Sequence, residues 1–455
     1  MKEKKLSNQV HFISLGCARN IVDSEIMLSF LTQNNYIIST NLKQADVIIV
    51  NTCGFLQKAR EEGIAILKKI FQKKKPSSKI IVTGCMIPLH IKKLQQLFPK
   101  IHYYLGPGDI DKIIFAIQEK KPGQIISFKK SFLEKKPRTL LSTPPHYAYL
   151  KISEGCSKFC SYCLIPQIKG PLKSKSQKQV LIEFRSLLKN GVKEIILVAQ
   201  DLSDYGKDRK EKNALTSLLK TLLKEKGNFW LRLLYLYPDD INEDFLQLMK
   251  TDTRLCSYLD IPLQHINTSI LKSMGRKTKK EKILQTIEKI RFHIPNCVIR
   301  TTFIVGFPKE GEKEFQELLD FIRQARLDHV GVFPFSPEKN TLAATFPHQI
   351  SKKIREKRAA LLMKEQLKIV KEKNKKMIGQ RLLCVIDRYH PDSKFLLQGR
   401  HQGQCPEVDS SIILNKFDKV HSFGERHEVK ITGFSEHDLI GTVLSFSLKI
   451  PKINC

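Results

Sequence analysis

The chain has 455 residues, of which 41% are hydrophobic and 27% charged, so it can form roughly two to four domains with packed cores. No apolar run approaches the roughly 18 residues that a membrane span needs, and residues 1–10 lack an apolar signal core, which predicts a cytoplasmic protein without a membrane partner. The 11 cysteines therefore favour metal binding or catalysis over disulfides, and the net charge of +33 favours an anionic partner such as RNA or the ribosome.

Residues 10–120 alternate between apolar runs and helical stretches. The apolar runs predict three buried strands, at 10–15, 47–50 and 80–83. Helices are predicted between and after the first two strands, at 23–31 and 57–71. Because strands that alternate with helices form parallel sheets covered on both faces, we predict a parallel-sheet α/β domain over residues 8–122.

Each of these strands is followed closely by a cysteine, at Cys17, Cys53 and Cys85. Ligands bind at the carboxyl ends of the strands in open parallel sheets, so the three thiols are expected to converge at one edge. Three separate buried cysteines are the alternative, because free cysteine is common in cores. The threefold repetition of the same position favours an iron–sulfur cluster with one iron left open.

Residues 123–145 contain Pro, Lys and Ser with little periodicity, which predicts a linker. Strands and helices alternate again up to about residue 345. Six strands are predicted there, at 148–152, 194–199, 231–235, 258–262, 298–305 and 329–335. Six successive βα units predict a partial (β/α) barrel of the TIM type, with its chemistry in the loops at the carboxyl ends of the strands.

The first of these loops contains Cys156, Cys160 and Cys163 in the spacing CxxxCxxC. A four-iron cluster usually takes four cysteines, so three thiolates leave one iron free to bind a small molecule and pass it an electron. This is the layout of radical chemistry with S-adenosylmethionine, in which the cofactor carries the reaction. Zinc is the alternative, but a structural zinc site wants four ligands and no matching pair of cysteines lies nearby. The remaining cysteines match no ligand spacing and are interpreted as structural or incidental: Cys256, Cys297, Cys384, Cys405 and Cys455.

The C-terminal part of the chain changes character. Residues 348–376 show a basic helical pattern that Gly379 is expected to stop. Five short strands follow, at 382–387, 394–399, 411–414, 428–434 and 440–445. They predict a small antiparallel β-barrel over residues 376–449, of a kind that binds nucleic acid or protein. The 11 basic and 9 acidic residues of 376–455 give too small an excess for strong phosphate binding, which favours a protein target.

Two sets of three cysteines followed by a small β-barrel resemble the radical S-adenosylmethionine methylthiotransferases along nearly the whole chain. The resemblance implies a radical SAM core over residues 142–373 and a C-terminal barrel similar to a TRAM domain. It implies S-adenosylmethionine and two [4Fe–4S] clusters as cofactors. The first three cysteines would hold an auxiliary cluster, and the CxxxCxxC cysteines would hold the cluster that generates the radical.

Several segments resemble the branch of this family that modifies a ribosomal protein rather than tRNA. They are residues 14–20, 22–25, 51–55, 259–265, 300–308, 325–331 and 405–409. Two positions depart from the family pattern. Ala18-Arg19 stands where the family usually has Pro-Lys, and Lys309-Glu310-Gly311 stands where it has Gly-Glu-Thr.

The ribosomal-protein branch implies a transferase that adds a methylthio group to the β-carbon of an aspartate in small-subunit ribosomal protein twelve. Its partners would be that protein, free or within the ribosomal subunit, an electron donor such as flavodoxin or ferredoxin, and a sulfur source. The reaction removes hydrogen from an unactivated carbon, a step that no acidic or basic side chain performs. No catalytic residue is predicted beyond the cluster ligands.

Four further residues are candidates for contact with S-adenosylmethionine. Tyr162 directly precedes Cys163 and could pack near the adenine, or it could be a local core aromatic. Gln200 ends the second barrel strand and could contact the cofactor or cap a turn. Gly306 permits close approach of the backbone, or it could serve a tight turn. Arg300 could pair with a carboxylate, or it could sit in a surface ion pair.

Two alternative functions stay open. The first is a tRNA adenosine methylthiotransferase of the MiaB type, which aromatic stacking positions on the barrel would favour. The phenylalanines of the barrel fall on predicted strands, however, and are interpreted as core residues: Phe395, Phe417, Phe423, Phe434 and Phe446. The second is an iron–sulfur protein that binds RNA or carries electrons without turnover.

Overall fold

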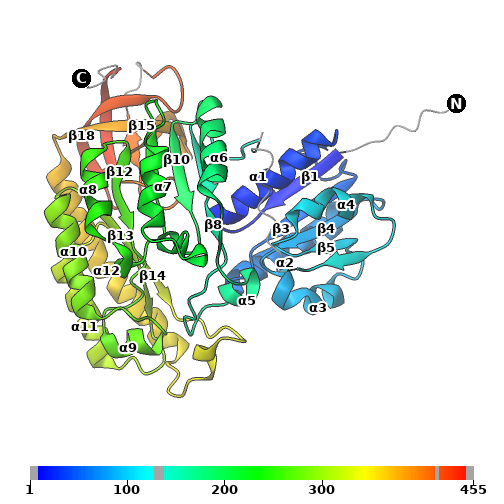
Figure 1. Cartoon of the computed structure of the whole chain (residues 1–455), viewed down its shortest axis with the longest axis horizontal. Coiled ribbons are helices and arrows are strands. Elements are labelled where there is room, and N and C mark those ends of the chain that lie inside the picture. Colours follow the sequence, from blue (N-terminus) through cyan, green and yellow to red (C-terminus); the bar gives the residue numbers. More distant parts are fainter. Residues whose placement is uncertain (1–8, 128–137, 139, 416–419, 447–455) are drawn as a thin grey trace.

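The computed structural model describes residues 9–127, 138, 140–415 and 420–446. This part of the chain forms an N-terminal α/β domain, a central α/β domain and a C-terminal β-barrel seated on the central domain (Figure 1). Parts of the predicted linker and of the predicted domains lie outside the described residues, namely residues 8, 128–137, 139 and 447–449. Cys455 also lies outside them. Among the described helices, none combines the length and apolarity that a membrane crossing requires.

The N-terminal domain has a six-stranded parallel sheet in the order β2-β1-β3-β4-β5-β6. Its strands are β1 (Gln9–Ser14), β2 (Ile37–Ile38), β3 (Val47–Thr52), β4 (Lys79–Gly84), β5 (Tyr103–Leu105) and β6 (Gly123–Ile125). Its helices are α1 (Ala18–Gln33), α2 (Gln57–Lys73), α3 (Ile87–Leu97) and α4 (Ile113–Gln118). Side chains of β3 alternate between two separate cores, with Val47 and Ile49 in one and Ile48 and Val50 in the other. Apolar cores on both faces explain why helices cover both sides of the sheet.

The central domain has a second parallel sheet, in the order β14-β13-β12-β11-β10-β7. Its strands are β7 (Tyr147–Lys151), β10 (Glu194–Val198), β11 (Trp230–Leu233), β12 (Leu255–Asp260), β13 (Val298–Val305) and β14 (His329–Pro334). The main helices are α6 (Gln177–Lys189), α7 (Ala214–Leu222), α8 (Glu243–Thr251), α10 (Lys280–His293), α11 (Glu312–Ala325) and α12 (Lys352–Met377). The sheet is open, so the prediction of a partial barrel with six strands is confirmed.

Short helices and strands lie in the loops at the carboxyl ends of these strands. They are β8 (Ser153–Glu154), α5 (Ile165–Lys169), β9 (Lys173–Ser174) and α9 (Thr268–Ser273). The chain turns with positive φ after three of the strands, at Tyr235, Gln264 and Gly306. These sharp turns place the loops over one end of the sheet, where the predicted chemistry lies.

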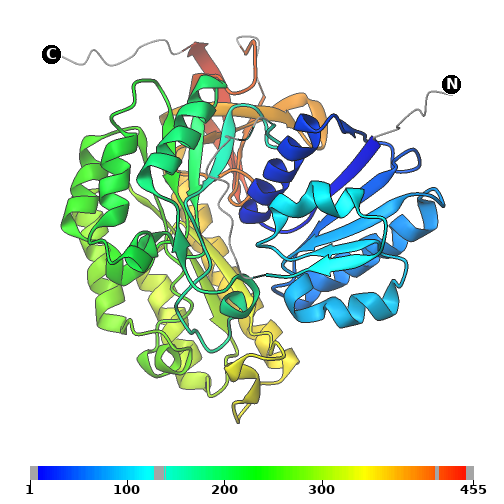
Figure 2. The same cartoon turned by 45° about the vertical axis from the view of Figure 1, so that its right-hand side comes forward.

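The inner face of the open sheet is covered by the other two domains. Its aromatic side chains, such as Tyr149 and Trp230, form one apolar cluster with Val22 of α1 and with Val385 and Cys405 of the C-terminal barrel. Figure 2 shows α1 beside the central domain and the barrel above it. The three domains therefore share a core instead of touching only at polar surfaces.

The C-terminal domain is a closed barrel in the order β15-β16-β17-β19-β18. Its strands are β15 (Arg381–His390), β16 (Ser393–His401), β17 (Ile412–Leu414), β18 (Arg426–Ser435) and β19 (Asp438–Phe446). All neighbouring pairs are antiparallel except β17 and β19, which are parallel. Phe434 packs on the barrel core as interpreted, but the core interpretation is wrong for Phe395 and Phe423, which are 84% and 40% exposed. Phe417 and the side chain of Phe446 lie outside the described part of the chain.

A loop between β16 and β17 docks the barrel onto the central sheet. The Tyr147 hydroxyl donates to the Glu407 carboxylate at 2.8 Å, and the Tyr258 hydroxyl donates to the Asp409 carboxylate at 2.7 Å. The Arg400 guanidinium lies 2.8 Å from the Glu194 carboxylate of β10. These hydrogen bonds and this ion pair cross the boundary between the two domains, so polar contacts as well as the shared apolar cluster fix the barrel on the sheet.

Candidate active site

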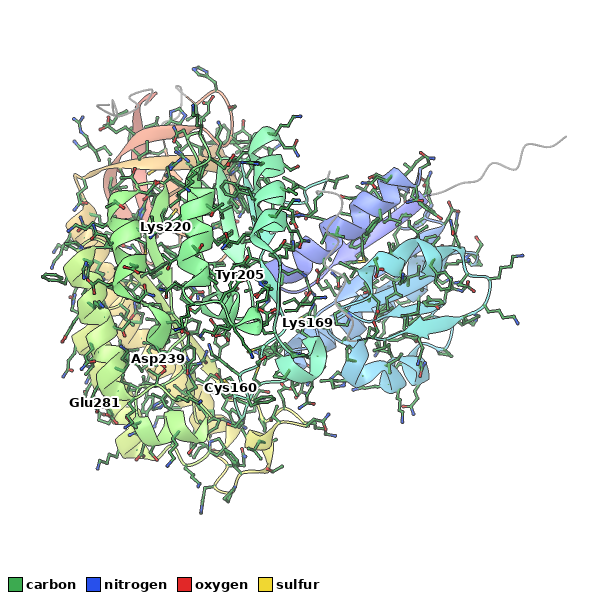
Figure 3. The ribbon with its side chains drawn as sticks, viewed as in Figure 1. Cys160, Lys169, Tyr205, Lys220, Asp239 and Glu281 are labelled. Atoms are coloured by element: carbon green, nitrogen blue, oxygen red, sulfur yellow. The ribbon has the colours of Figure 1, made fainter. Side chains whose placement is uncertain are left out.

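Cys156, Cys160 and Cys163, hereafter the core cysteines, lie in the loop after β8. The loop closes on itself, because the Cys156 amide donates to the Gly170 carbonyl at 3.1 Å and the Cys163 amide donates to the Cys160 carbonyl at 3.0 Å. All three thiols are partly exposed. In Figure 3, Cys160 lies in the central domain on the side toward the N-terminal domain.

Cys17, Cys53 and Cys85, hereafter the auxiliary cysteines, follow the adjacent strands β1, β3 and β4. Hydrogen bonds continue past the strand ends, from the Leu15 amide to the Asn51 carbonyl and from the Cys85 amide to the Thr52 carbonyl, both at 2.9 Å. The structure therefore brings these cysteines to one edge of the sheet. They are close enough that charge on Cys17 or Cys53 raises the pKa of the Cys85 thiol.

Glycines beside the auxiliary cysteines leave no room for a side chain. At Gly16, which has a φ of +100°, a Cβ atom would lie 2.9 Å from the Cys53 Cβ. At Gly84, also with a φ of +100°, it would lie 2.4 Å from both the Asn51 Oδ1 and the Thr52 carbonyl oxygen. The close packing of these loops is therefore possible only because these positions are glycine.

We expect Gly84→Ala to lose the auxiliary cluster and about half of the iron, because the added Cβ must push the Cys85 loop away from β3. Iron per chain and the visible absorbance of the reconstituted protein measure the loss. Gly191→Ala is the matched control, since Gly191 also has a positive φ, of +83°, but has open space around its Cβ position. Full iron content in Gly84→Ala would contradict this account of the loop.

Burial and a nearby arginine set the acidity of the thiols. Burial raises the pKa of Cys85 and of Cys163 to about 12 each. Burial is the largest influence on the Cys17 thiol and acts to raise its pKa, but the charge of Arg19 and hydrogen bonds from Arg19 and Asn20 together outweigh it, so the pKa is lowered. A coordinated iron would deprotonate such thiols outright.

The donors fit two iron–sulfur clusters better than single metal ions. Among the described residues, no group of three or more His, Cys, Asp or Glu side chains converges tightly enough to hold one ion. A zinc ion would need ligands about 2.0–2.3 Å away, whereas a [4Fe–4S] cluster takes each thiolate on a separate iron and accepts a wider triangle. Three thiols in each set also leave one iron without a cysteine ligand.

A buried amide beside this site is available to a ligand. Gln200 follows β10, and both its Oε1 and its Nε2 are buried without a hydrogen-bond partner among the described residues. Buried amide groups are normally hydrogen-bonded. Gln200 therefore has donor and acceptor capacity that suits a polar cofactor such as S-adenosylmethionine.

The two cysteine sets face each other across the domain boundary. Arg19 lies in the first turn of α1, close to Cys17. Its guanidinium donates to the Ala199 carbonyl of the central domain at 3.0 Å and also acts on the pKa of Cys163. Cys85 packs in one apolar cluster with Leu164 and Ile168, which follow the core cysteines. Arg19 thus keeps a positive charge between the sets at a position where the family usually has lysine.

Four buried charges connect the same two regions, and we call them the charge tetrad: Asp23, Lys151, Glu154 and Lys169. Asp23 comes from α1, and the other three come from segments that flank the core cysteines. The Lys169 ammonium lies 2.5 Å from Glu154 and 3.3 Å from Asp23, and the Lys151 ammonium lies 2.9 Å from Glu154 and also pairs with Asp23. Lys169 lies where α5 meets the N-terminal domain (Figure 3). Two cations and two anions balance, so the tetrad joins the domains without net charge.

Tyr162 lies between two core cysteines. Its ring packs edge-on against Phe307, with centroids 6.5 Å apart, and burial raises the pKa of its hydroxyl while the Arg276 guanidinium acts to lower it. The structure thus gives Tyr162 an apolar and a cationic neighbour at the cluster loop.

Gly306 and Arg300 already have protein partners. At Gly306, with a φ of +71°, a Cβ atom would lie 2.1 Å from the Cγ of Arg355, and the Gly306 amide donates to the Glu310 carboxylate at 2.8 Å. Arg300 lies 3.1 Å from Asp260 and 3.2 Å from Asp409, so it joins the central sheet to the docking loop of the barrel. Their contact with a cofactor stays a prediction.

Sequence reasoning missed several residues at this site. Arg19, Asp23, Lys169 and Arg276 have no local signal in the sequence, because their partners are distant in the chain. Glu338 is another, since its carboxylate accepts from Arg60 of α2 at 2.6 Å and links the loop after β14 to the N-terminal domain. Long-range ion pairs of this kind leave no periodic or spacing pattern to find.

Comparison with known proteins agrees with the three domains. The Uncharacterized protein family UPF0004 matches residues 9–106, the Radical SAM superfamily matches residues 150–322, and the TRAM domain matches residues 378–444. Two solved structures show a similar fold at low identity. They are the radical S-adenosylmethionine methyltransferase TsrM from Kitasatospora setae (TM-score 0.53, 13% identity, 72% of this chain and 75% of that chain) and the enzyme OxsB (TM-score 0.51, 14% identity, 80% and 58%).

Full-length relatives are much more similar. The ribosomal protein uS12 methylthiotransferase RimO of Protochlamydia amoebophila is 50% identical over 441 residues, which cover 96% of this chain and 93% of the relative. The protein of that name from Chlamydia caviae is 50% identical over 454 residues, 99% and 98% of the two chains. The one from Bdellovibrio bacteriovorus is 38% identical over 456 residues, 98% and 99%.

The open parallel sheet, the cysteine loop at its carboxyl end and the matched domains define a radical S-adenosylmethionine enzyme, a transferase of the methylthiotransferase class. Its cofactors are S-adenosylmethionine and two [4Fe–4S] clusters, as the sequence predicts. Within this class, the chain belongs to the RimO family.

Proposed function

We propose that this enzyme adds a methylthio group to the β-carbon of an aspartate of ribosomal protein uS12, which is small-subunit ribosomal protein twelve. One observation carries the proposal. The chain is 50% identical to proteins named uS12 methylthiotransferase RimO along 93–98% of their lengths. We propose domain bounds of 8–122, 142–373 and 376–449 for the three parts.

In this proposal the core cysteines hold the cluster that serves S-adenosylmethionine, and the auxiliary cysteines hold the second cluster. When bound, the clusters and S-adenosylmethionine supply one-electron chemistry and sulfur that no side chain can provide. The protein positions these groups. Gln200 and Tyr162 would contact S-adenosylmethionine, while Gly306 and Arg300 would shape the wall of its site.

The spatial order of the residues supports transfer between the two cysteine sets. Arg19 and the charge tetrad hold the sets at a fixed separation across the domain boundary. The shared apolar cluster around Cys85 joins the auxiliary cysteines to the segment that follows the core cysteines. A target aspartate would have to enter this region to receive the methylthio group.

The remaining partners follow from the same chemistry. We propose an electron donor such as flavodoxin or ferredoxin, a sulfur source that replenishes the auxiliary cluster, and a location in the cytoplasm. The net charge of +33 would steer the enzyme toward ribosomal RNA around uS12, in the free protein or the assembled subunit.

A tRNA adenosine is the second candidate substrate. The observation that favours it is the exposed aromatic surface of the barrel, where Phe395 is 84% exposed and the rings of Tyr389 and Phe423 pack edge-on with centroids 5.2 Å apart. Such side chains can stack on unpaired bases. The full-length similarity to uS12 methylthiotransferases outweighs this feature.

Mass spectrometry of a strain lacking this gene tests both candidates. We expect uS12 to lose a methylthio group while the tRNA pool stays unchanged, and a plasmid copy of the gene to restore the modification. Loss of a methylthio group from tRNA alone would reject the uS12 proposal. A plasmid copy with Cys160→Ala is the control for restoration that depends on the core cluster.

A further inference from the structure

The loop that follows α9 lies directly against the loop of the core cysteines. The Ser161 amide donates to the Met274 carbonyl at 3.0 Å, and the Ser161 hydroxyl donates to the Ser273 carbonyl at 2.8 Å. At Gly275, with a φ of +73°, a Cβ atom would lie 2.9 Å from the Phe159 carbonyl oxygen. This backbone contact holds the next residue, Arg276, beside the core cysteines.

Arg276 is the exception among the buried arginines. Five arginines are buried in the described part of the chain, and four of them form ion pairs with Glu or Asp, namely Arg138, Arg232, Arg358 and Arg400. Arg276 is 9% exposed and has no carboxylate within 4.0 Å among the described residues. Buried cations normally have an anionic partner, because an unpaired charge is costly away from water.

The neighbours of Arg276 are polar or aromatic groups and include no carboxylate, although the Cys160 thiol is close enough to act on the pKa of the guanidinium. Its Nη2 donates to the Pro262 carbonyl at 2.9 Å, and its guanidinium stacks 4.5 Å from the centroid of Tyr237. Its Nε is buried and has no hydrogen-bond partner among the described residues. One strong donor of this group is therefore still available.

Lys158 shows what a paired cation looks like in the same place. Its ammonium lies 3.9 Å from the centroid of the same Tyr237 ring, but it also pairs with Asp201 and lies 3.2 Å from Asp204. Of the two cations on this ring, one is neutralised by carboxylates and the other is not. An anionic group that arrives with a ligand would neutralise Arg276, the second of these cations.

We propose that Arg276 anchors a carboxylate at the loop of the core cysteines. A guanidinium presents parallel N–H donors that match a carboxylate. The proposed function, on which this inference rests, brings two carboxylates to the site, that of the methionyl group of S-adenosylmethionine and that of the target aspartate. Arg276 lies beside Tyr162, which stands between two cluster ligands in the sequence. We therefore expect the carboxylate to be that of S-adenosylmethionine.

Calorimetric titration of the enzyme loaded with both clusters separates the two sources. In Arg276→Gln we expect S-adenosylmethionine to bind about 10- to 100-fold more weakly, the usual loss when a hydrogen bond to a charged group is removed. In the second arm, each enzyme is titrated with uS12 and with a uS12 variant in which the target aspartate is asparagine, and the two affinities are compared. Unchanged cofactor affinity with loss of the preference for aspartate would assign the carboxylate to the substrate instead.

Controls keep the outcome interpretable. Arg276→Lys retains the charge and should lose less affinity, and it serves if Arg276→Gln fails to fold or to hold its clusters. Arg254→Gln removes an arginine that stacks on Phe229 and pairs with Asp252, and its cofactor affinity should stay within about twofold of the unmodified enzyme.

Three results would overturn or limit the proposal in different ways. Affinities within twofold in both arms, for a folded Arg276→Gln enzyme or for Arg276→Lys in its place, would overturn it. A shifted reduction potential of the core cluster with both affinities unchanged would also overturn it, because the cluster itself would then be the partner of Arg276. Failure to modify uS12 would reject the proposed function but leave the titration with S-adenosylmethionine valid.

Discussion

Cys160→Ala should abolish formation of 5′-deoxyadenosine, whereas Cys53→Ala should retain it and lose only sulfur insertion. Cys160 belongs to the loop after β8, and Cys53 follows β3 in another domain, so each change removes a ligand from one cysteine set only. Loss of a residue that only hydrogen-bonds to a ligand typically lowers metal affinity or activity by roughly 10- to 100-fold. Removing a direct ligand should lower them further. Anaerobic assays that quantify deoxyadenosine and methylthiolated uS12 separately would measure both effects.

Cys256→Ala is the control for removing a thiol. Cys256 is buried in the core between the domains and lies on β12, away from both cysteine sets, so both products should form normally. The assignment of separate roles would be wrong if Cys53→Ala and Cys160→Ala lost deoxyadenosine equally while the fold and the other cluster stayed intact.

The second large effect should come from the charge tetrad. Lys169→Met leaves Asp23 and Glu154 with only Lys151 as a cation, in a place where both carboxylates are buried. Breaking a buried ion pair by removing one partner typically costs about 3–5 kcal/mol. We therefore expect a loss of this size in the apparent free energy of unfolding, measured by urea titration of the cluster-loaded enzyme.

A surface pair provides the comparison for this loss. Lys352 and Glu356 lie 3.8 Å apart on α12 with side chains that are 82% and 57% exposed. Lys352→Met should change the free energy of unfolding by less than about 0.5 kcal/mol. If Lys169→Met were as mild as Lys352→Met, the tetrad would not be what holds the two domains together.

The sequence predicts the strands that are buried on both faces. Val47–Val50 and Ile80–Val82 are continuous apolar runs, and both lie in central strands of the N-terminal sheet. The short strands β5 and β6 have three residues each, too few for any period to show. The predicted start of the first helix, at residue 23, comes after its true start at Ala18, because buried polar residues such as Asn20 and Asp23 hide the apolar face.

The residues of the candidate site also fall into two groups, those that a local sequence pattern reveals and those that only the fold reveals. Cysteine spacing is a local property, so the six thiols and their grouping are visible in the sequence. The partners of Arg300 are not, because Asp409 lies 109 residues away on the docking loop of another domain. The same holds for the tetrad, in which Lys169 reaches Asp23 across 146 residues. Only the fold shows which charges are paired, and so only the fold singles out Arg276.

The docking of the C-terminal barrel has a further consequence. Arg400 and Asp409 are buried against Glu194 and Arg300, so an isolated barrel would expose charges and apolar surface that normally face the central sheet. The barrel is therefore packed on the central sheet and does not swing independently to collect a substrate. A substrate bound to the barrel is therefore held at a fixed orientation relative to the cysteines. Substrates would be selected by the angle at which they approach, because the barrel does not move to reach them.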